Sequence, residues 1–587
     1  MLSDPLAARS LQDCGLPAAW ASSAAWTVLD TQFDAGERFL DIWQAWRQDP
    51  RRPRILHYVG IAEHTDCVSC DPLPAPPALP QITERQLLAQ ELAAHCLNLE
   101  PGFHRISLAH GAVSLTLCLG SVDAMLGEHV FQADTLYAHA PANKWTAQLL
   151  ARRCRRGARF CVVTKPDGFA ASSSELHCAT LLRGAGFQLD DTADPAGIRS
   201  GRFDPRWDIP NSRSPARHEA PTPARCAVIG AGIAGASVAH AMALRGWQVT
   251  VLDQEAVPAG GASSLPAGLA VPHVSADDSP RSRITRRGIR LMVQHAGRLL
   301  STGQDWEQSG VVERRPGDTA LLHPDAAWVK PHRLVQAWLT HKGITFVGNT
   351  KVVSLQHSDG LWSLCDESGK TVGPFEAVVV ANAMGCTMSL NNIHGTGLPE
   401  RADLIHSLSA LQAIHGTLSH GSYAEAIPDL PAIPVNGNGC FIPHVPDAAG
   451  EKWCAGSTFE TDPLAAADLW TQHTSNMDRL QQLLPGVGFT LAETLDRGPV
   501  AQWSATRCVT HDRLPLVGPV GRDQNGGLWL SVGMGSRGLS FSALCAELLV
   551  ARLCAEPWPV EFSLSRSLDS NRVRHKRRSN VSAPPAG

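Results

Sequence analysis

The segment Arg225–Asp253, which reads RCAVIGAGIAGASVAHAMALRGWQVTVLD, decides the fold of the larger part of this chain. A short apolar run at 226–229 leads into glycines with the spacing GxGxxG. A helical stretch of small residues and a second apolar run, 248–252, follow. This order predicts a strand, a tight turn, a helix and a parallel strand. The glycine spacing also explains the uncharged stretch 226–244 better than a membrane span does.

Three glycines and one acid give this unit its predicted function. Gly230 permits the tight turn, Gly232 lets a pyrophosphate approach the backbone, and Gly235 lets the helix pack closely on the strand. The positive N-terminus of the helix points at the phosphates. Asp253 stands where an acid accepts hydrogen bonds from ribose hydroxyls. We therefore predict a dinucleotide site, although the motif alone does not separate FAD from NAD.

A second glycine-rich segment favours a flavin. Residues 528–554 place three glycines just before a long apolar helix, and residues 376–385 predict another buried strand. Backbone N–H groups and a helix N-terminus at this place suit the electron-rich pyrimidine edge of a flavin. The alternative is a plain strand-to-helix turn.

The length and composition of the chain exclude several classes of protein. With 587 residues the chain has room for about four domains. Its 44% hydrophobic and 18% charged residues exclude global disorder. The 51 basic and 55 acidic residues give a net charge of −4, which excludes a nucleic-acid binder that is basic over its whole surface. A local basic face remains compatible with this balance.

The cysteines and the N-terminal sequence predict a cytoplasmic protein. The 16 cysteines are scattered, and the first residues show no basic region followed by an apolar core. Free thiols in a reducing compartment are the simplest interpretation. Cys67 and Cys70 form a CxxC with His64 nearby, but a zinc site needs a second ligand pair, so we expect no metal.

Changes in composition along the chain predict its domains. Residues 204–223 carry five prolines without apolar periodicity and are typical of a linker. Before it, strand-like and helical runs alternate, which predicts a parallel α/β sheet. We therefore expect a first domain at 1–203, the linker at 204–223, a second domain at 224–575 and a disordered basic tail at 576–587.

Several motifs resemble the glycine oxidase and D-amino-acid oxidase type of FAD enzyme, and more closely a family of bifunctional enzymes that modify the wobble uridine of tRNA. Besides the GxGxxG unit, the motifs are GASSLPAGLAVPHVS (Gly261–Ser275), AGSTFETD (Ala455–Asp462), RLQQLLPG (Arg479–Gly486), ATRCVTHDRLPLVGPV (Ala505–Val520) and GMGSRGLSFSALCAELL (Gly533–Leu549). They occur in family order. The resemblance implies an α/β fold with a Rossmann-like, methyltransferase-type N-terminal sheet. A two-lobed unit would follow, with an FAD-binding α/β lobe and an antiparallel β substrate lobe.

The resemblance also implies a reaction. In that family the FAD part removes a carboxymethyl group from carboxymethylaminomethyl-2-thiouridine, and a fused part methylates the freed amine with S-adenosylmethionine. A substrate carboxylate needs a rigid cation, and the family position places Arg507 there as anchor. Arg537 is expected to shape the flavin loop. The residues expected to hold FAD are Gly230, Gly232, Gly235, Asp253, Gly261, Ala262, Ser263, Gly535, Ser536, Arg537, Gly538 and Leu539.

The N-terminal part departs from the family pattern. Glu63 falls where such methyltransferases hold the ribose of S-adenosylmethionine. The family's loop resembles ETGFGTGLNF, whereas only Gly36 is left in the corresponding LDTQFDAGERF (29–39). Tyr137 falls where the family has a catalytic Asp, and Asp134 lies out of register. We therefore expect a retained fold that supports tRNA docking or stability, with an active methyltransferase as the alternative.

A tRNA partner needs local positive surface. The basic runs that would supply it are Arg51, Arg52 and Arg54; Arg152, Arg153, Arg155, Arg156 and Arg159; Arg281, Arg283, Arg286, Arg287 and Arg290; and Arg572, Arg574, Lys576, Arg577 and Arg578. Each run alone is also typical of an ordinary solvated face. The alternative function is oxidation of a free amino acid such as glycine or sarcosine, with an N-terminal binding module. No membrane partner is expected.

Overall fold

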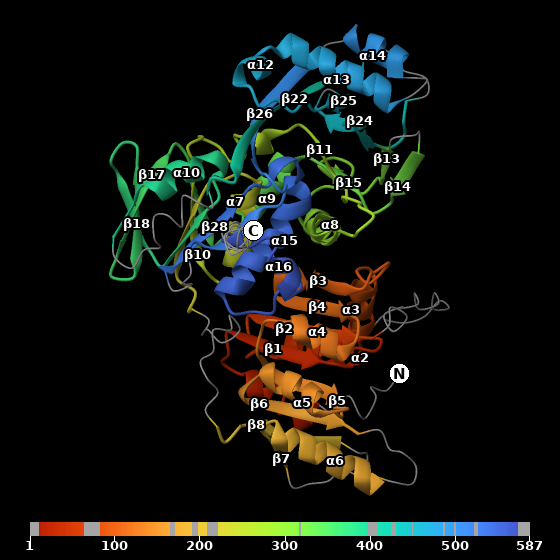
Figure 1. Ribbon diagram of the computed structural model, residues 1–587, viewed down its shortest axis with the longest axis vertical. Coiled ribbons are helices and arrows are strands. Elements are labelled where there is room, and N and C mark those ends of the chain that lie inside the picture. The colour runs from red at the N-terminus through yellow and green to blue at the C-terminus, as the bar shows by residue number, and fades with distance from the viewer. Residues whose placement is uncertain are drawn as a thin grey trace, which may run out of the picture. The chain divides into compact units, whose positions relative to one another are not determined.

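The computed structural model describes residues 11–63, 83–164, 171–190, 198–207, 221–315, 319–395, 408–423, 430–448, 450–484, 488–497, 500–521 and 526–572 (Figure 1). The chain folds into two units. One contains Met1–Pro221 with Ala551–Ser565, and the other contains Thr222–Val550 with Arg566–Gly587.

The first unit is built on a sheet whose strands, among the described residues, follow the order β3-β4-β2-β1-β5-β6-β8-β7. Five strands run parallel: β1 (Ala25–Asp30), β2 (Ile55–Ala62), β4 (Val113–Leu119), β5 (Ala133–His139) and β6 (Cys154–Val163). The strands β3 (Gly102–Leu108) and β8 (Ile198–Phe203) run antiparallel to these five, and β7 (Phe187–Leu189) pairs antiparallel with β8 at the edge of the sheet. This is the predicted Rossmann-like, methyltransferase-type sheet. Its order reverses between β1 and β5, the point at which doubly wound sheets bind ligands.

Helices cover both faces of this sheet because its central strands are apolar on both sides. Helices α2 (Glu37–Gln48) and α3 (Glu84–Ala93) share one core with Val28 and Tyr58. Helices α4 (Val122–Glu128), α5 (Lys144–Arg152) and α6 (Ala171–Gly184) share another with Leu29 and Val59. Neighbouring residues of one strand thus enter different cores, as the alternation of side chains along a strand requires.

Residues 551–565 belong to the first unit, although the sequence analysis assigned them to the second domain. They contact the edge strand β3. The backbone N–H of Phe103 donates to Glu561 at 3.3 Å, and the buried Arg105 donates to the carbonyl of Pro557. An edge strand exposes unpaired backbone groups, and this segment pairs one of them. No break in composition marks the change, because helix α15 (Gly538–Leu553) runs through it.

The second unit contains the predicted dinucleotide-binding sheet, with strand order β16-β10-β9-β20-β28-β27. Its strands are β9 (Arg225–Ile229), β10 (Gln248–Leu252), β16 (Ile344–Val347), β20 (Ala377–Val380), β27 (Leu516–Pro519) and β28 (Leu528–Val532). All pairs are parallel except β27 with β28. Helix α7 (Ile233–Leu244) follows β9, and helix α15 follows β28.

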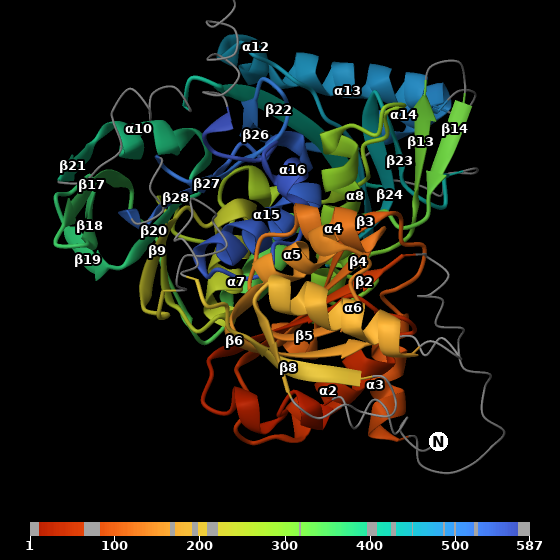
Figure 2. The ribbon, with the colours of Figure 1, turned by 60° about the horizontal axis from the view of Figure 1, so that its bottom comes forward.

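A second lobe of this unit is a largely antiparallel sheet with the order β14-β13-β23-β24-β25-β22-β26. Its strands are β13 (Val311–Arg315), β14 (Thr319–His323), β22 (Leu411–Ser422), β23 (Val435–Gly437), β24 (Gly439–Asp447), β25 (Gly450–Gly456) and β26 (Val500–Thr510). Helices α13 (Leu469–Leu483) and α14 (Gly488–Asp496) pack on it (Figures 1 and 2). The predicted two-lobed architecture is confirmed.

Within the described ranges no helix is both long and apolar enough to cross a membrane. The same ranges hold no group of three or more His, Cys, Asp or Glu side chains arranged to bind a metal ion. His64, Cys67 and Cys70 lie outside the described residues. The described cysteines are free thiols.

A buried ion pair fixes helix α7 against helix α15. Arg245 follows the last turn of α7, and its two terminal nitrogens donate to the carboxylate of Glu547 at 2.8 and 2.9 Å. The two side chains are 6% and 12% exposed. Because the N-termini of both helices lie beside the same cavity, this pair holds two parts of the candidate site in place.

We predict that Glu547→Ala destabilises the protein by about 3 kcal/mol, because it leaves the Arg245 guanidinium buried without its carboxylate. The double variant Arg245→Met/Glu547→Leu should lose much less, since no charge remains to be solvated. Urea unfolding followed by circular dichroism measures both. Equal losses in the single and double variants would contradict the interpretation.

Candidate active site

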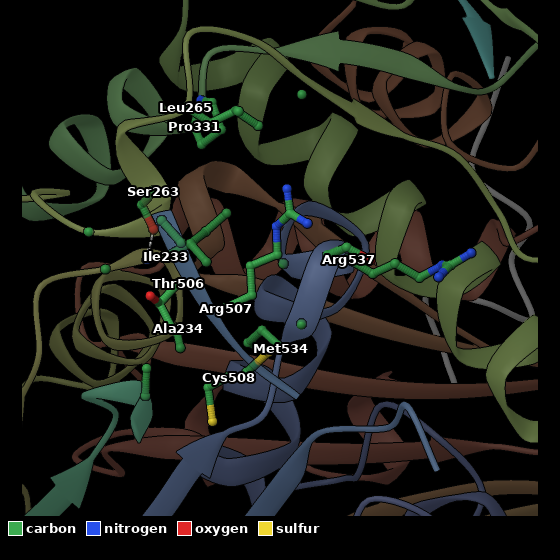
Figure 3. A pocket seen from close by; sticks show the side chains of 18 of the residues that line it. Ile233, Ala234, Ser263, Leu265, Pro331, Thr506, Arg507, Cys508, Met534 and Arg537 are labelled. Carbon is green, nitrogen blue, oxygen red and sulfur yellow. Dashed lines mark hydrogen bonds between the residues drawn. The ribbon is translucent and has the colours of Figure 1, made fainter. Parts of the chain in front are cut away.

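A cavity of about 600 Å³ lies in the second unit, where both lobes line it (Figure 3). The predicted residues that line it are Gly230, Gly232, Asp253, Gly261, Ala262, Ser263, Arg507, Gly535, Ser536, Arg537, Gly538 and Leu539. Gly235 packs behind the turn and does not line the cavity. Glu63 is in the first unit, at the end of β2.

The glycine turn after β9 has the geometry that its sequence predicts. Gly230 has a φ of +106°, and a Cβ there would lie 2.8 Å from the carbonyl oxygen of Ala381. A Cβ on Gly235 would lie 1.8 Å from the carbonyl oxygen of Gly230, so only glycine lets α7 approach the strand. Gly232 is different, because a Cβ there would meet only Ser263 Oγ at 3.4 Å. Its backbone therefore faces the cavity.

Two polar side chains organise this turn. Asp253 accepts hydrogen bonds from the backbone N–H groups of Ala231 and Glu255. Ser263 Oγ accepts from the N–H of Ile233 at 2.9 Å, at the start of α7 (Figure 3). The carboxylate and the hydroxyl line the cavity and keep further lone pairs for hydrogen bonds.

The glycine loop after β28 forms another part of the wall. Gly533 and Gly535 have φ angles of +80° and +57°, which favour glycine. A short 3₁₀ turn at Gly535–Arg537 leads directly into α15. The positive N-terminus of a sixteen-residue apolar helix therefore faces the cavity.

Arg507 projects from β26 into the cavity and is only 7% exposed (Figure 3). Its guanidinium donates to Ser457 Oγ at 2.7 Å and to the carbonyl of Thr458 at 3.4 Å. It lies 5.0 Å from the ring centroid of Phe459. On the facing strand β22, a Cβ on Gly416 would lie 2.5 Å from Arg507 Nη1, so this glycine makes room for the guanidinium.

Arg507 forms no ion pair with a carboxylate within the described part of the chain. Burial lowers its pKa to about 10, because a buried cation lacks hydration. The side chain still carries its charge at neutral pH. A buried, charged arginine held only by neutral groups is a ready site for an anionic ligand.

Sequence reasoning missed the residues that position Arg507. Ser457 and Phe459 belong to the motif Ala455–Asp462, which was recognised but given no role. That motif adjoins β25, next to β22 in the sheet, and this pairing brings it to Arg507. His273 and Glu313 also line the cavity. His273 belongs to the motif Gly261–Ser275, which carries no assigned role for it, and no sequence signal points to Glu313.

Many of the arginines proposed to form basic surface are paired with acids. The pairs are Arg155–Asp134, Arg156–Asp204, Arg286–Asp278, Arg290–Asp325 and Arg572–Asp512. Arg287 is buried, and residues 574–578 lie outside the described residues.

A cluster of side chains fills the switch point of the first unit. Asp30 ends β1 and accepts from Arg38 at 2.8 Å and from the Tyr58 hydroxyl at 2.6 Å. Arg38 also lies 5.0 Å from the ring centroid of Tyr137, which is the residue of β5 opposite Asp30. Phe33 packs on Gly60, where a Cβ would lie 2.3 Å from the Phe33 ring.

Comparisons with known proteins identify relatives that cover both units of the chain. Residues 225–313 and 311–552 match the family model described as FAD dependent oxidoreductase. A tRNA 5-methylaminomethyl-2-thiouridine biosynthesis bifunctional protein from Albidiferax ferrireducens is 42% identical over 99% of this chain and 98% of its own length. One of the same name from Polaromonas naphthalenivorans is 38% identical over 95% of this chain and 92% of its own.

Among solved structures, glycine oxidase from Bacillus cereus matches with a TM-score of 0.44 and 16% identity, over 56% of this chain and 94% of that one. The match to the bifunctional relatives extends over nearly the whole chain, including the first unit. The chain therefore belongs to the family of tRNA 5-methylaminomethyl-2-thiouridine biosynthesis bifunctional proteins, and residues 225–552 form its FAD dependent oxidoreductase part.

Proposed function

We propose that the second unit removes the carboxymethyl group from 5-carboxymethylaminomethyl-2-thiouridine in tRNA, leaving 5-aminomethyl-2-thiouridine. The observation that carries the proposal is the buried Arg507, whose charge has no carboxylate partner in the described structure. The names of the full-length relatives support tRNA as substrate. Glycine and sarcosine also carry a carboxylate, but both full-length relatives described above are named for tRNA modification and not for oxidation of a free amino acid.

The residues around the cavity fit FAD. The turn at Gly230 and Gly232 leaves backbone room for a pyrophosphate, and Asp253 offers lone pairs to a ribose. The loop at Gly535 and the α15 N-terminus would face the pyrimidine edge of the flavin. When bound, FAD supplies the hydride acceptor for the carbon between the amine and the carboxylate.

Arg507 would bind the substrate carboxylate through two parallel N–H groups, which fixes the orientation of the carboxymethyl carbon. Ser457 and Phe459 hold the guanidinium in one orientation, so the substrate carboxylate would bind to N–H groups whose directions are already fixed. The positive charge of Arg507 also disfavours the ammonium form of the nearby substrate amine. Oxidation requires that neutral form, so no separate base is needed.

The carbon between the amine and the carboxylate gives up a hydride, and the neutral nitrogen keeps its proton as part of an iminium, C=N⁺–H. Water then adds to that carbon, the C–N bond breaks, and glyoxylate leaves. The primary amine stays on the uridine and takes up the proton that the added water releases.

We predict that Arg507→Gln lowers kcat/KM for tRNA bearing carboxymethylaminomethyluridine by roughly 100-fold, because a buried charged hydrogen bond is worth 2–5 kcal/mol. Arg507→Lys should recover only part of this loss, since an ammonium cannot bind bidentately. Mass spectrometry of the nucleosides measures the reaction.

Arg333→Gln is the matched control. Arg333 lies on helix α9 (Pro331–Leu339), its side chain is 55% exposed, and it is absent from the cavity wall. Flavin absorbance near 450 nm should be equal in all variants. An unchanged carboxymethyl peak with flavin-loaded wild-type protein would contradict the proposed function, as would peroxide formation from glycine or sarcosine alone.

We further propose that the first unit does not methylate the freed amine. Methyl donors of this fold bind at the switch point of the sheet, between β1 and β5. There the side chains of Arg38 and Tyr137 lie together, and Asp30 is already paired. Gln32 and Asp34 replace glycines of the family pattern, so the loop has lost the freedom for close approach. Glu63, the expected ribose ligand, is exposed at the end of β2.

We predict that titration of the whole protein with S-adenosylmethionine gives no saturable heat at millimolar ligand. With S-adenosylmethionine present, the tRNA product should remain 5-aminomethyl-2-thiouridine, because the donor site is occupied by protein side chains. Appearance of the methylaminomethyl nucleoside in the mass spectrum would overturn this proposal without affecting the oxidative step.

A further inference from the structure

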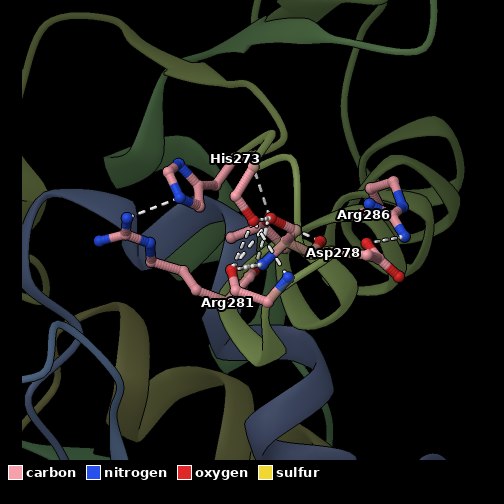
Figure 4. Close-up of polar contacts among 8 residues, drawn as sticks. His273, Asp278, Arg281 and Arg286 are labelled. Carbon is pink, nitrogen blue, oxygen red and sulfur yellow. Dashed lines mark hydrogen bonds and ion pairs between the residues drawn. The ribbon is translucent and has the colours of Figure 1, made fainter.

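A second group of cationic and imidazole side chains borders the same cavity. It consists of His273, Arg281 and Arg537, which we call the outer cluster. His273 and Arg537 line the cavity, and Arg281 lies in the first turn of helix α8 (Pro280–Leu299). In Figure 3 Arg537 extends away from Arg507, and Figure 4 shows Arg281 reaching His273.

The hydrogen bond within the outer cluster fixes the tautomer of its histidine. Arg281 Nη2 lies 2.6 Å from His273 Nε2. A guanidinium can only donate, so Nε2 accepts and the proton of the neutral ring is on Nδ1. Burial and the two arginines lower the pKa of His273 to about 4, which keeps the ring neutral. Its Nδ1–H remains a donor.

The two guanidinium groups of the outer cluster form no ion pair with a carboxylate within the described residues. Asp277 acts on His273, and Glu313 acts on both His273 and Arg537, but Glu313 accepts hydrogen bonds from His323 at 2.6 Å and from Arg315 at 3.3 Å. The guanidinium of Arg537 forms no hydrogen bond or ion pair within the described residues, although its backbone N–H donates to the carbonyl of Met534. Burial and the neighbouring Arg281 lower the pKa of Arg537.

We propose that the outer cluster binds a backbone phosphate of the RNA substrate and thereby positions the modified nucleotide over the cavity. This proposal rests on the proposed function. Arginine forks suit phosphate oxygens, and the positive N-terminus of α8 adds to the potential. Phosphate contacts fix the register of a nucleic acid, while groups in a pocket read the base.

The two cationic sites match the two anionic ends of the substrate nucleotide. Its carboxylate is at the tip of the side chain on the base, and its phosphates are on the opposite, backbone side. Arg507 lies inside the cavity and serves the first, whereas the outer cluster borders the cavity and serves the second. A free amino acid has only one carboxylate and would leave the outer cluster unused.

The test compares Arg281→Gln with wild-type protein, both loaded with FAD. Binding of a fluorescent anticodon stem-loop is measured at several salt concentrations. Loss of one phosphate contact should reduce the slope of log affinity against log salt by about 0.7–0.9. The kcat/KM for modified tRNA should fall by roughly tenfold, as expected for one charge-assisted hydrogen bond. The kcat/KM for the free carboxymethylaminomethyluridine nucleoside should not change.

Arg225→Gln is the matched control. Arg225 begins β9, at the opposite end of that strand from the glycine turn, and its side chain is 51% exposed. Its salt slope should equal that of the wild type. Wild-type protein alone gives a further measurement, because a 3′,5′-bisphosphate of the nucleoside should have a higher kcat/KM than the nucleoside.

Several outcomes would overturn the proposal. An unchanged salt slope and tRNA kcat/KM in Arg281→Gln would show that the outer cluster does not contact RNA, while the proposed function stands. Loss of flavin absorbance in that variant would assign the outer cluster to a cofactor phosphate. Failure of wild-type protein to act on tRNA at all would instead refute the proposed function.

Discussion

A guanidinium that is 7% exposed and has no carboxylate partner among the residues the structure describes is stable only while neutral dipoles hold it or an anion compensates its charge. Arg507 is in this state, and the surrounding lobe is arranged to tolerate it. Gly416 leaves space, Ser457 accepts a hydrogen bond, and Phe459 presents its ring. Binding of a substrate carboxylate would relieve the desolvation of the arginine. In the proposed reaction, the desolvation of Arg507 that remains after folding would therefore favour binding of the substrate carboxylate.

The same electrostatic argument extends to the edge of the cavity, where Arg281 and Arg537 repel each other and Glu313 is shared with other partners. In the proposed complex, Arg507 and the two arginines of the outer cluster would favour a ligand with anions at both ends. A local arrangement of this kind would let a chain with a net charge of −4 bind RNA. In two of the other arginine runs part of the charge is paired with nearby acids, at Arg155, Arg156, Arg286 and Arg290.

Local backbone constraints made the dinucleotide unit predictable from sequence. Gly230 needs a positive φ and Gly235 needs close packing, so the residue types alone reveal the turn. The role of Arg507 is predicted from its position in the family motif and not from a local sequence pattern, because its pocket forms only when β22, β25 and β26 pair in the sheet. In the outer cluster His273 and Arg281 are only eight residues apart, whereas Arg537 comes from the loop before α15, and no sequence spacing encodes its approach to the other two. The extent of the first unit was missed for a related reason, since α15 shows no break where residues 551–565 begin.

If the first unit has lost methyl transfer, as proposed, it keeps its fold without a binding site for the donor. A glycine loop leaves backbone groups open to a ligand, and replacing its glycines removes that access. In this chain the space at the switch point is taken by Arg38, whose charge is met by Asp30 in a pair that is itself nearly buried. Substitution of only one member of this pair would destabilise the unit, because the other member would remain charged and buried without a partner. The unit can then be retained for its packing, including the contacts of β3 with residues 551–565, which do not depend on a methyl donor.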